Sequence, residues 1–226
     1  MINTNIHEPV MLSEIKEFIP NSKKINVIDA TFGGGGYSKA LLEEFDIIQL
    51  IAIDRDPITE VFAKDLKKRF KNFKIINGCY SEIDELIFSK NTNIKKFDVI
   101  IFDLGLSSNQ LNNPKRGFSF MKDGPLDMNM GGSKIQASDV INSFSEEKLA
   151  NIFFELGEEK FANRIARNII KQRKVKLINS TKVLSDLIRY SIPIINLKKS
   201  KINPATKTFQ ALRIYVNDEL NELKKA

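Results

Sequence analysis

Short apolar runs alternate with stretches of helical periodicity over the first hundred residues of the chain. Four runs are rich in β-branched residues and have the length of buried strands, and they occupy residues 25–30, 50–54, 73–77 and 97–103. Helices are predicted between them over residues 37–44 and 57–70. This alternation is typical of βαβ units around a parallel sheet, and right-handed crossovers predict these two helices on the two faces of the sheet.

After Leu104 the pattern changes to a loop rich in Gly, Pro, Asn and Ser that extends to about Lys134. A connection of this length in a compact domain is either functional or disordered. Its large apolar residues include Phe118, Phe120, Met121, Met128 and Met130. Disordered segments are poor in such residues, so we expect an ordered and functional loop.

Helical periodicity dominates the rest of the chain. Ser143 and Glu146 have the spacing of a capping box, and Gly157 is expected to end that helix. The next helix is predicted over residues 158–173, with apolar residues on one side. Its basic residues recur at helical spacing on another side: Lys160, Arg164, Arg167 and Lys171.

A last helix is predicted to begin at Asn203 and Pro204. Its apolar stripe comprises Phe209, Leu212, Val216, Leu220 and Leu223. The pattern as a whole predicts an α/β fold in three segments. Residues 1–109 form the first part of a core, residues 110–203 form a loop and a basic helical insertion, and residues 204–226 return to the core.

Composition agrees with a globular protein, since 42% of the 226 residues are hydrophobic and 28% are charged. The single cysteine, Cys79, can form neither an internal disulfide nor a metal cluster, which fits a reducing compartment. No signal peptide or membrane span is visible in the pattern. We therefore expect a cytoplasmic protein that has no metal site and no membrane contact.

Positive charge is concentrated in one segment. The formal net charge is +7, yet residues 158–207 contain thirteen Lys or Arg against three acids, and the remaining residues sum to −3. A basic segment of this kind is expected to face a polyanion.

A glycine cluster, Gly33 to Gly36, separates the first predicted strand from the first helix. Glycine allows the backbone to turn sharply and to approach a ligand closely. A tight turn without a ligand would have the same sequence, so the cluster alone is weak evidence.

Asp54 ends the second predicted strand, where Rossmann-like sites place an acid that accepts hydrogen bonds from ribose hydroxyls. The alternative is a surface carboxylate paired with Arg55. With the glycine cluster, a nucleotide site is favoured, although these motifs do not separate a nicotinamide cofactor from S-adenosylmethionine.

Asp103 ends the fourth predicted strand and is followed by a loop of small residues. A buried strand seldom ends in an unpaired carboxylate unless something binds there, because the unsatisfied group is costly. In methyltransferases of this architecture, that position brings the acceptor amine to the methyl donor. Asp103 is therefore our first candidate for a catalytic residue.

Several separated motifs occur together in the chain. They are HEPVML at 7–12, AIDRDP at 52–57, DLGLSS at 103–108, RGFSFM at 116–121, DGPLDM at 123–128 and PATKTFQALR at 204–213. With these motifs the chain resembles the MraW family of bacterial small-subunit ribosomal RNA cytosine-N4 methyltransferases. The resemblance covers nearly the whole sequence and implies a Rossmann-like methyltransferase core interrupted by a helical insertion.

The resemblance implies S-adenosylmethionine as the cofactor. The family's binding positions map onto Gly35, Gly36, Tyr37, Asp54, Tyr80, Asp103 and Gln110. Gly33 of the glycine cluster is a further candidate for cofactor binding. Family members commonly have His at the position of Tyr37 and Phe at that of Tyr80. The ring of Tyr80 could still pack on adenine, so the Tyr37 contact is the more doubtful one.

The substrate implied by the resemblance is a cytosine of 16S ribosomal RNA in the small ribosomal subunit. Its base must leave the stack to react, and Phe118 or Phe120 could stack on it; a core role for both is equally open. Contacts to phosphate are expected from Lys160, Arg164, Arg167 and Lys171. His7, the only histidine, could be a base or could serve in capping or packing.

Two other functions stay open: a small-molecule methyltransferase, and a non-catalytic RNA-binding remnant. Family members continue past the last predicted helix with further sheet strands, and no such pattern follows here. We therefore expect an unpaired sheet edge beside the fourth strand, and with it self-association or poor solubility. A homodimer is also left open.

Overall fold

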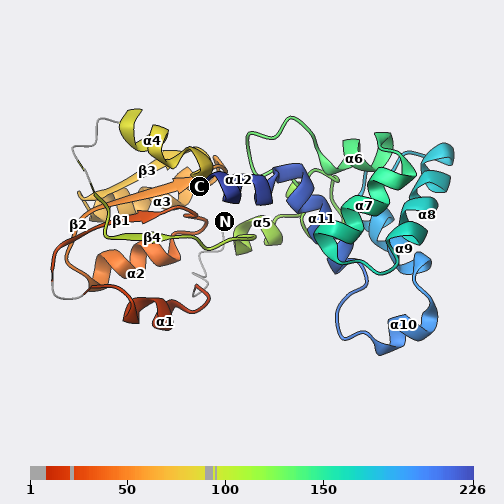
Figure 1. The fold of residues 1–226 in the computed structure, drawn as a ribbon, viewed down its shortest axis with the longest axis horizontal. Coiled ribbons are helices and arrows are strands. Elements are labelled where there is room, and N and C mark those ends of the chain that lie inside the picture. Colours follow the sequence, from red (N-terminus) through yellow and green to blue (C-terminus); the bar gives the residue numbers. More distant parts are fainter. Residues whose placement is uncertain (1–8, 21–22, 90–93, 95) are drawn as a thin grey trace. The chain divides into compact units, whose positions relative to one another are not determined.

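The computed structural model describes residues 9–20, 23–89, 94 and 96–226. The chain divides into two compact units (Figure 1): the first comprises Met1–Asn109 and Asn221–Ala226, and the second comprises Gln110–Leu220. Residues 204–220, which we expected to return to the core, thus belong to the second unit. His7 lies outside the described residues.

The first unit contains a parallel four-stranded sheet. Its strands are β1 (Ile25–Asp29), β2 (Ile47–Asp54), β3 (Phe73–Asn77) and β4 (Val99–Ile101). Their order in the sheet is β3-β2-β1-β4 (Figure 1). The α/β class and the parallel sheet are confirmed, although β2 begins three residues before the predicted strand and β4 is shorter than predicted at both ends.

Helices cover both faces of this sheet, but not in the predicted way. They are α1 (Leu12–Glu17), α2 (Gly36–Glu44), α3 (Thr59–Arg69) and α4 (Ile83–Ser89). Apolar residues of α1, α2 and α3 share one core cluster, and those of α4 belong to the cluster on the opposite face. The expectation that the helices now seen as α2 and α3 lie on different faces is wrong. Strands β1, β2 and β3 add in one direction, so two crossovers of the same hand place their helices on the same face.

Strand β4 is at an edge of the sheet. Among the described residues it pairs only with β1, and the side chain of Ile100 is half exposed. An open edge offers unpaired backbone groups to another chain. The structure thus has the edge from which we predicted self-association, and the association itself stays a prediction.

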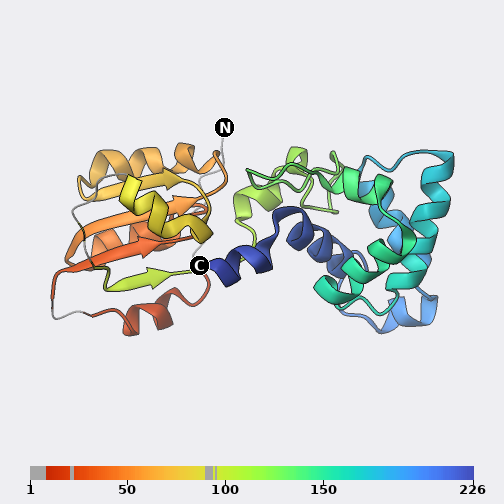
Figure 2. The same ribbon diagram turned by 45° about the horizontal axis from the view of Figure 1, so that its top comes forward.

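The second unit is helical. After α5 (Ser108–Asn112), which spans the unit boundary, come the 3-10 helix η2 (Pro114–Arg116) and α6 (Ala137–Ser143), α7 (Glu146–Gly157), α8 (Ala162–Val175), α9 (Thr181–Ser191), α10 (Ile194–Lys199) and α11 (Thr206–Asn217). Helix α12 (Glu219–Lys225) begins in this unit and belongs to the first unit from Asn221 on. Helix α7 packs against α8 and α11, and α8 packs against α9 (Figure 2). Residues without solvent exposure in this core include Leu149, Phe153, Ile165, Leu184 and Leu212.

Helix ends in the second unit differ from the predicted ones. The N-cap of α7 is Ser145, whose Oγ accepts a hydrogen bond from the Lys148 N–H at 3.2 Å, so the capping box at Ser143 is wrong. Helix α8 begins at Ala162, which leaves Lys160 in the preceding turn. The predicted last helix is two helices, because Asp218 adopts a left-handed conformation with φ 51°.

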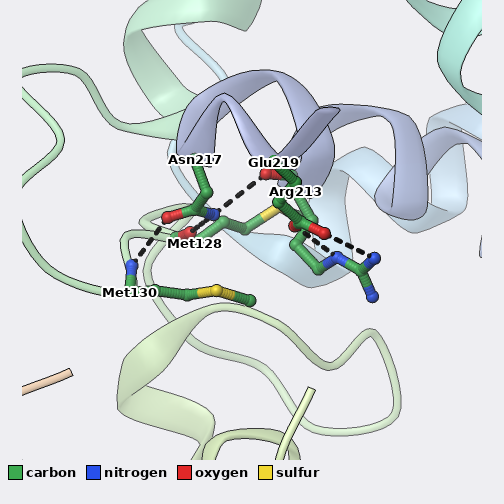
Figure 3. Close-up of polar contacts among 5 residues, drawn as sticks. All are labelled: Met128, Met130, Arg213, Asn217 and Glu219. Atoms are coloured by element: carbon green, nitrogen blue, oxygen red, sulfur yellow. Dashed lines mark hydrogen bonds and ion pairs between the residues drawn. The ribbon is translucent and has the colours of Figure 1, made fainter. Parts of the chain in front are cut away.

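The long loop of the second unit is held by Asn217, a fully buried residue at the end of α11 (Figure 3). Its side-chain amide donates to the Met128 carbonyl at 2.8 Å and accepts from the Met130 N–H at 2.9 Å. Met128 has a positive φ of 61°, a conformation that costs a non-glycine residue energy unless its surroundings fix it. Arg213 donates two hydrogen bonds to Glu219, which joins α11 to α12. The loop is therefore ordered by contacts with a helix almost 90 positions later in the chain.

Within the described ranges, none of the helices is both long and apolar enough to cross a lipid bilayer.

Candidate active site

The carboxyl edge of the sheet holds three aspartates. Asp29 ends β1, Asp54 ends β2, and Asp103 follows β4 by two residues. The order of the strands reverses its direction between β1 and β4, since β2 and β3 lie on one side of β1 and β4 lies on the other. Parallel α/β sheets bind ligands at the carboxyl ends of their strands beside such a reversal. The three carboxylates therefore surround the expected binding position.

The glycine loop follows β1 directly and has the conformation that glycine favours. Gly33 and Gly35 have φ values of 54° and 80°. A Cβ atom on Gly35 would come within 2.7 Å of the Phe32 ring, so a side chain there would clash with a buried aromatic residue. Gly36 is the first residue of α2. No Cβ atoms cover the glycine backbone of this loop at the edge of the sheet, so a ligand could approach it closely.

Asp54 anchors that loop. Its Oδ2 accepts a hydrogen bond from the Gly33 N–H at 2.7 Å, and its Oδ1 accepts one from the Asp56 N–H at 2.9 Å. Burial raises the pKa of Asp54 above its ordinary value, and the two backbone donors oppose that rise. Each carboxylate oxygen can still accept a second hydrogen bond. Asp54 thus holds the glycine loop and has capacity left for hydroxyl donors of a ligand.

Asp103 is placed by its backbone. Its N–H donates to Thr31 Oγ1 at 2.6 Å. This bond continues the pairing of the segments that follow β1 and β4, in which the Ala30 N–H donates to the Ile101 carbonyl at 2.9 Å. In the part of the chain that the structure describes, no group hydrogen-bonds the Asp103 carboxylate. Partial burial raises its pKa. The carboxylate is therefore positioned at the sheet edge, and its acceptor sites are not used by the described residues.

Asp29 is a member of the site that sequence reasoning missed. It is buried, with 1% of its surface exposed, and it accepts hydrogen bonds from Ser38 Oγ at 2.6 Å and from the Thr31 N–H at 3.3 Å. Burial raises its pKa to about 6, and the charges of Asp54 and Asp103 contribute to the rise. An acid at the end of the first strand, four positions before the glycine cluster, was the signal that could have found it. Asp29 links the loop, through Thr31, to the start of α2.

The pH dependence of the free energy of unfolding should reveal the burial of Asp29. Its folded-state pKa of about 6 lies above the ordinary value of 3.8, so the native state binds more protons between these pH values. The stabilisation is complete below about pH 4 and is lost as the pH rises through 6, by about 3 kcal/mol in total at 1.36 kcal/mol per pKa unit. Denaturant unfolding between pH 4 and 7 measures it. Asp29→Asn should lack this part of the pH dependence, and parallel pH profiles for the two proteins would contradict the assignment.

The two tyrosines implied by the family resemblance have different surroundings. Tyr37 is buried, and its hydroxyl donates to the Val10 carbonyl. Tyr80 is partly exposed and lies edge-on to Phe102, with 5.8 Å between the ring centroids. Phe102 directly follows β4. An aromatic pair therefore lies beside the same strand as Asp103, whereas the polar group of Tyr37 is engaged by the N-terminal segment.

The predicted Gln110, Phe118 and Phe120 belong to the second unit, as do the predicted basic residues. Gln110 is buried. Phe118 is also buried, with the Arg116 guanidinium 5.7 Å from its ring centroid, which favours the packing role of its two alternatives. Phe120 is only partly buried and lies edge-on to Phe209 at 5.2 Å. Base stacking by Phe120 stays a prediction.

The basic residues predicted to contact RNA are all exposed: Lys160, Arg164, Arg167 and Lys171. Three of them lie on α8. Arg167 also forms an ion pair with Glu146 at 3.4 Å, which offsets part of its charge. Over the described ranges, no group of three His, Cys, Asp or Glu side chains is arranged to hold a metal ion.

Comparisons with a family profile and with individual known proteins agree on one family. The sequence profile of the MraW methylase family matches residues 4–226. Ribosomal RNA small subunit methyltransferase H of Rickettsia bellii is 44% identical over 224 residues, which cover 97% of this chain and 69% of that protein. The protein of the same name from Wolbachia sp. subsp. Drosophila simulans is 46% identical over 221 residues, covering 97% of this chain and 73% of its own length.

Proposed function

The chain belongs to the MraW methylase family, and from this premise we propose that it methylates the N4 amine of a cytosine in 16S ribosomal RNA, with S-adenosylmethionine as methyl donor. The observation that carries the proposal is the meeting of the glycine loop, Asp54 and Asp103 at the carboxyl edge of the sheet. The names of the relatives support ribosomal RNA of the small subunit as the substrate class. The basic segment 158–207 favours RNA over a small-molecule acceptor.

The residues at the sheet edge fit this cofactor. Three carboxylates with raised pKa values favour a cationic ligand, because positive charge relieves their burial and mutual repulsion. Asp54 has the acceptor capacity for ribose hydroxyls, and the Tyr80–Phe102 pair offers an aromatic surface for adenine. When bound, S-adenosylmethionine supplies an electrophilic methyl group on a positively charged sulfur.

Asp103 acts on the acceptor amine. The exocyclic nitrogen of cytosine is a poor nucleophile because its lone pair is delocalised into the ring. A carboxylate that accepts a hydrogen bond from this amine favours the pyramidal and more nucleophilic form. The same negative charge stabilises the nitrogen as it becomes positive. Thr31 fixes the backbone of Asp103, so the carboxylate is held in place before the substrate arrives.

Replacing Asp54 with Ala should weaken S-adenosylmethionine binding by about 1 to 3 kcal/mol, the scale for losing a hydrogen-bonded charged partner. Calorimetric titration measures this loss. Asp54→Asn retains one acceptor oxygen and should lose less, while Asp65→Ala, an exposed residue of α3, should bind as the parent does. Unchanged affinity of a folded Asp54→Ala protein would remove Asp54 from the site.

Replacing the four basic residues with Gln (Lys160, Arg164, Arg167 and Lys171) should flatten the salt dependence of RNA binding. The slope of log K against log salt should fall by up to about 3, at roughly 0.7 per lost phosphate contact on single strands. A matched variant that removes four exposed lysines of the first unit, Lys64, Lys68, Lys71 and Lys74, should keep the parental slope. Equal slopes for all proteins would mean that this surface is only solvated.

A further inference from the structure

Helix α10, the end of α9 and the residues that follow α10 form a largely exposed segment, residues 189–202, that we call the α10 arm. Ser191 and Ile192 are its buried residues. Helix α10 contributes no buried residue, and Figure 1 shows it between the connections from α9 and to α11. The exposed fractions of Ile194 and Ile195 are 72% and 64%, and that of Tyr190 is 78%. Large apolar side chains gathered in this way on one segment mark an interaction site more often than scattered single residues do.

The arm is also free of negative charge. Residues 187–207 contain five Lys or Arg and no Asp or Glu. Lys207 is engaged, since its Nζ donates to the Glu158 carbonyl at 2.9 Å. The other four basic residues are exposed: Arg189, Lys198, Lys199 and Lys201. A partner must therefore offer negative charge next to flat or apolar groups.

We propose that the α10 arm binds a single-stranded segment of RNA, with Tyr190 stacked on a base and Lys198, Lys199 and Lys201 at neighbouring phosphates. The inference rests on the proposed RNA substrate and adds a contact surface separate from the basic residues of α8. Aromatic side chains beside a basic track are how proteins bind single strands without reading their sequence. Ile194 and Ile195 give the splayed bases an apolar surface to cover.

A lipid surface fits the arm less well. Binding of a helix in a membrane interface scales with the apolar area that it buries, and many such helices are about 20–30 residues long. Helix α10 has six residues, of which two isoleucines are strongly exposed. The charge of the arm and Tyr190 suit either anionic surface, so the small apolar area of α10 is the feature that favours RNA.

Tyr190→Trp gives a direct test, because the chain contains no tryptophan and the new residue would be its sole indole. The probe is a twelve-nucleotide single-stranded RNA of mixed sequence, titrated into the full chain. We expect its binding to quench the tryptophan emission. Tyr190→Ala should weaken the affinity for this RNA by about 5- to 150-fold, the loss that accompanies removal of one base stack, and should leave the salt slope unchanged. Tyr190→Phe should retain the affinity.

The lysines of the arm should affect the salt dependence of RNA binding. A triple Gln variant of Lys198, Lys199 and Lys201 should lower the salt slope by about 2, at roughly 0.7 per phosphate. The same number of charges removed at Lys64, Lys68 and Lys71 of the first unit serves as the control and should leave the slope unchanged. Circular dichroism checks that every variant is folded.

Four outcomes would overturn the inference. Emission unaffected by RNA, together with unchanged affinity of Tyr190→Ala, removes Tyr190 from the contact. Quenching by phosphatidylserine vesicles but not by RNA identifies a membrane surface instead. If the parent binds S-adenosylmethionine but no RNA, the proposed substrate fails together with the arm, whereas RNA binding that tolerates every arm variant overturns the arm alone.

Discussion

Replacing Asp103 with Asn should lower the rate of methyl transfer at saturating S-adenosylmethionine by about 10²- to 10³-fold, the loss seen when a preorganised partner of a transition-state charge is removed. The substitution preserves the shape of the side chain and removes its negative charge. The Asp103 N–H can still donate to Thr31 Oγ1, so the loop after β4 should keep its course. Transfer of a labelled methyl group to small ribosomal subunits measures the rate.

A matched control lies at the other end of the same strand. Asp98 precedes β4 and forms a surface ion pair with Lys23 at 2.6 Å. Asp98→Asn also removes one carboxylate charge, and its rate should stay within about twofold of the parent because surface ion pairs contribute little. Comparable rates for Asp103→Asn and the parent would show that the charge of Asp103 is not used in the reaction.

The strands and the glycine loop could be predicted from sequence because both depend on local patterns. Buried parallel strands are continuous apolar runs, and their carboxyl ends are marked by the residues that follow. For this reason Asp54 and Asp103 were found, and the structure places both at the carboxyl edge of the sheet. Their roles in binding and catalysis stay predictions.

The face of the sheet that each helix covers could not be predicted, because it depends on strand order, which is not a local property. Helices α2 and α3 share a face since β1, β2 and β3 add in one direction, and no residue of either helix indicates that direction. Asp29 was missed for a related reason. Its burial depends on Ser38 and on the packing of α2 against the sheet, neither of which appears in the spacing of its neighbours.

Errors in the second unit have a different origin. Ser143 and Ser145 both lie shortly before Glu146, and either serine could begin a helix there. In the structure Ser145 is the N-cap of α7. The break at Asp218 interrupts an apolar stripe that continues in the sequence, so Leu220 and Leu223 are exposed rather than buried. Periodicity describes which residues are apolar and does not show where a helix turns away from its core.

Asn217→Ala should destabilise the second unit by about 3 to 5 kcal/mol, since a buried backbone donor or acceptor left without a partner costs about 1 to 3 kcal/mol. The variant leaves two such groups in the loop, the Met130 N–H and the Met128 carbonyl (Figure 3). It also releases the left-handed backbone of Met128. Hydrogen exchange at the Met130 amide measures the change locally, and denaturant unfolding followed by circular dichroism measures it for the unit.

Asn163 provides the control because it is an exposed asparagine on helix α8 of the same unit. Asn163→Ala should change stability by no more than about 0.5 kcal/mol, as surface substitutions usually do. The comparison separates the contribution of the Asn217 side-chain hydrogen bonds from a general effect of alanine in a helix. If both variants unfold at the parental denaturant concentration and the Met130 amide stays protected in each, the loop is held by its apolar residues, and the hydrogen bonds of Asn217 contribute little to its order.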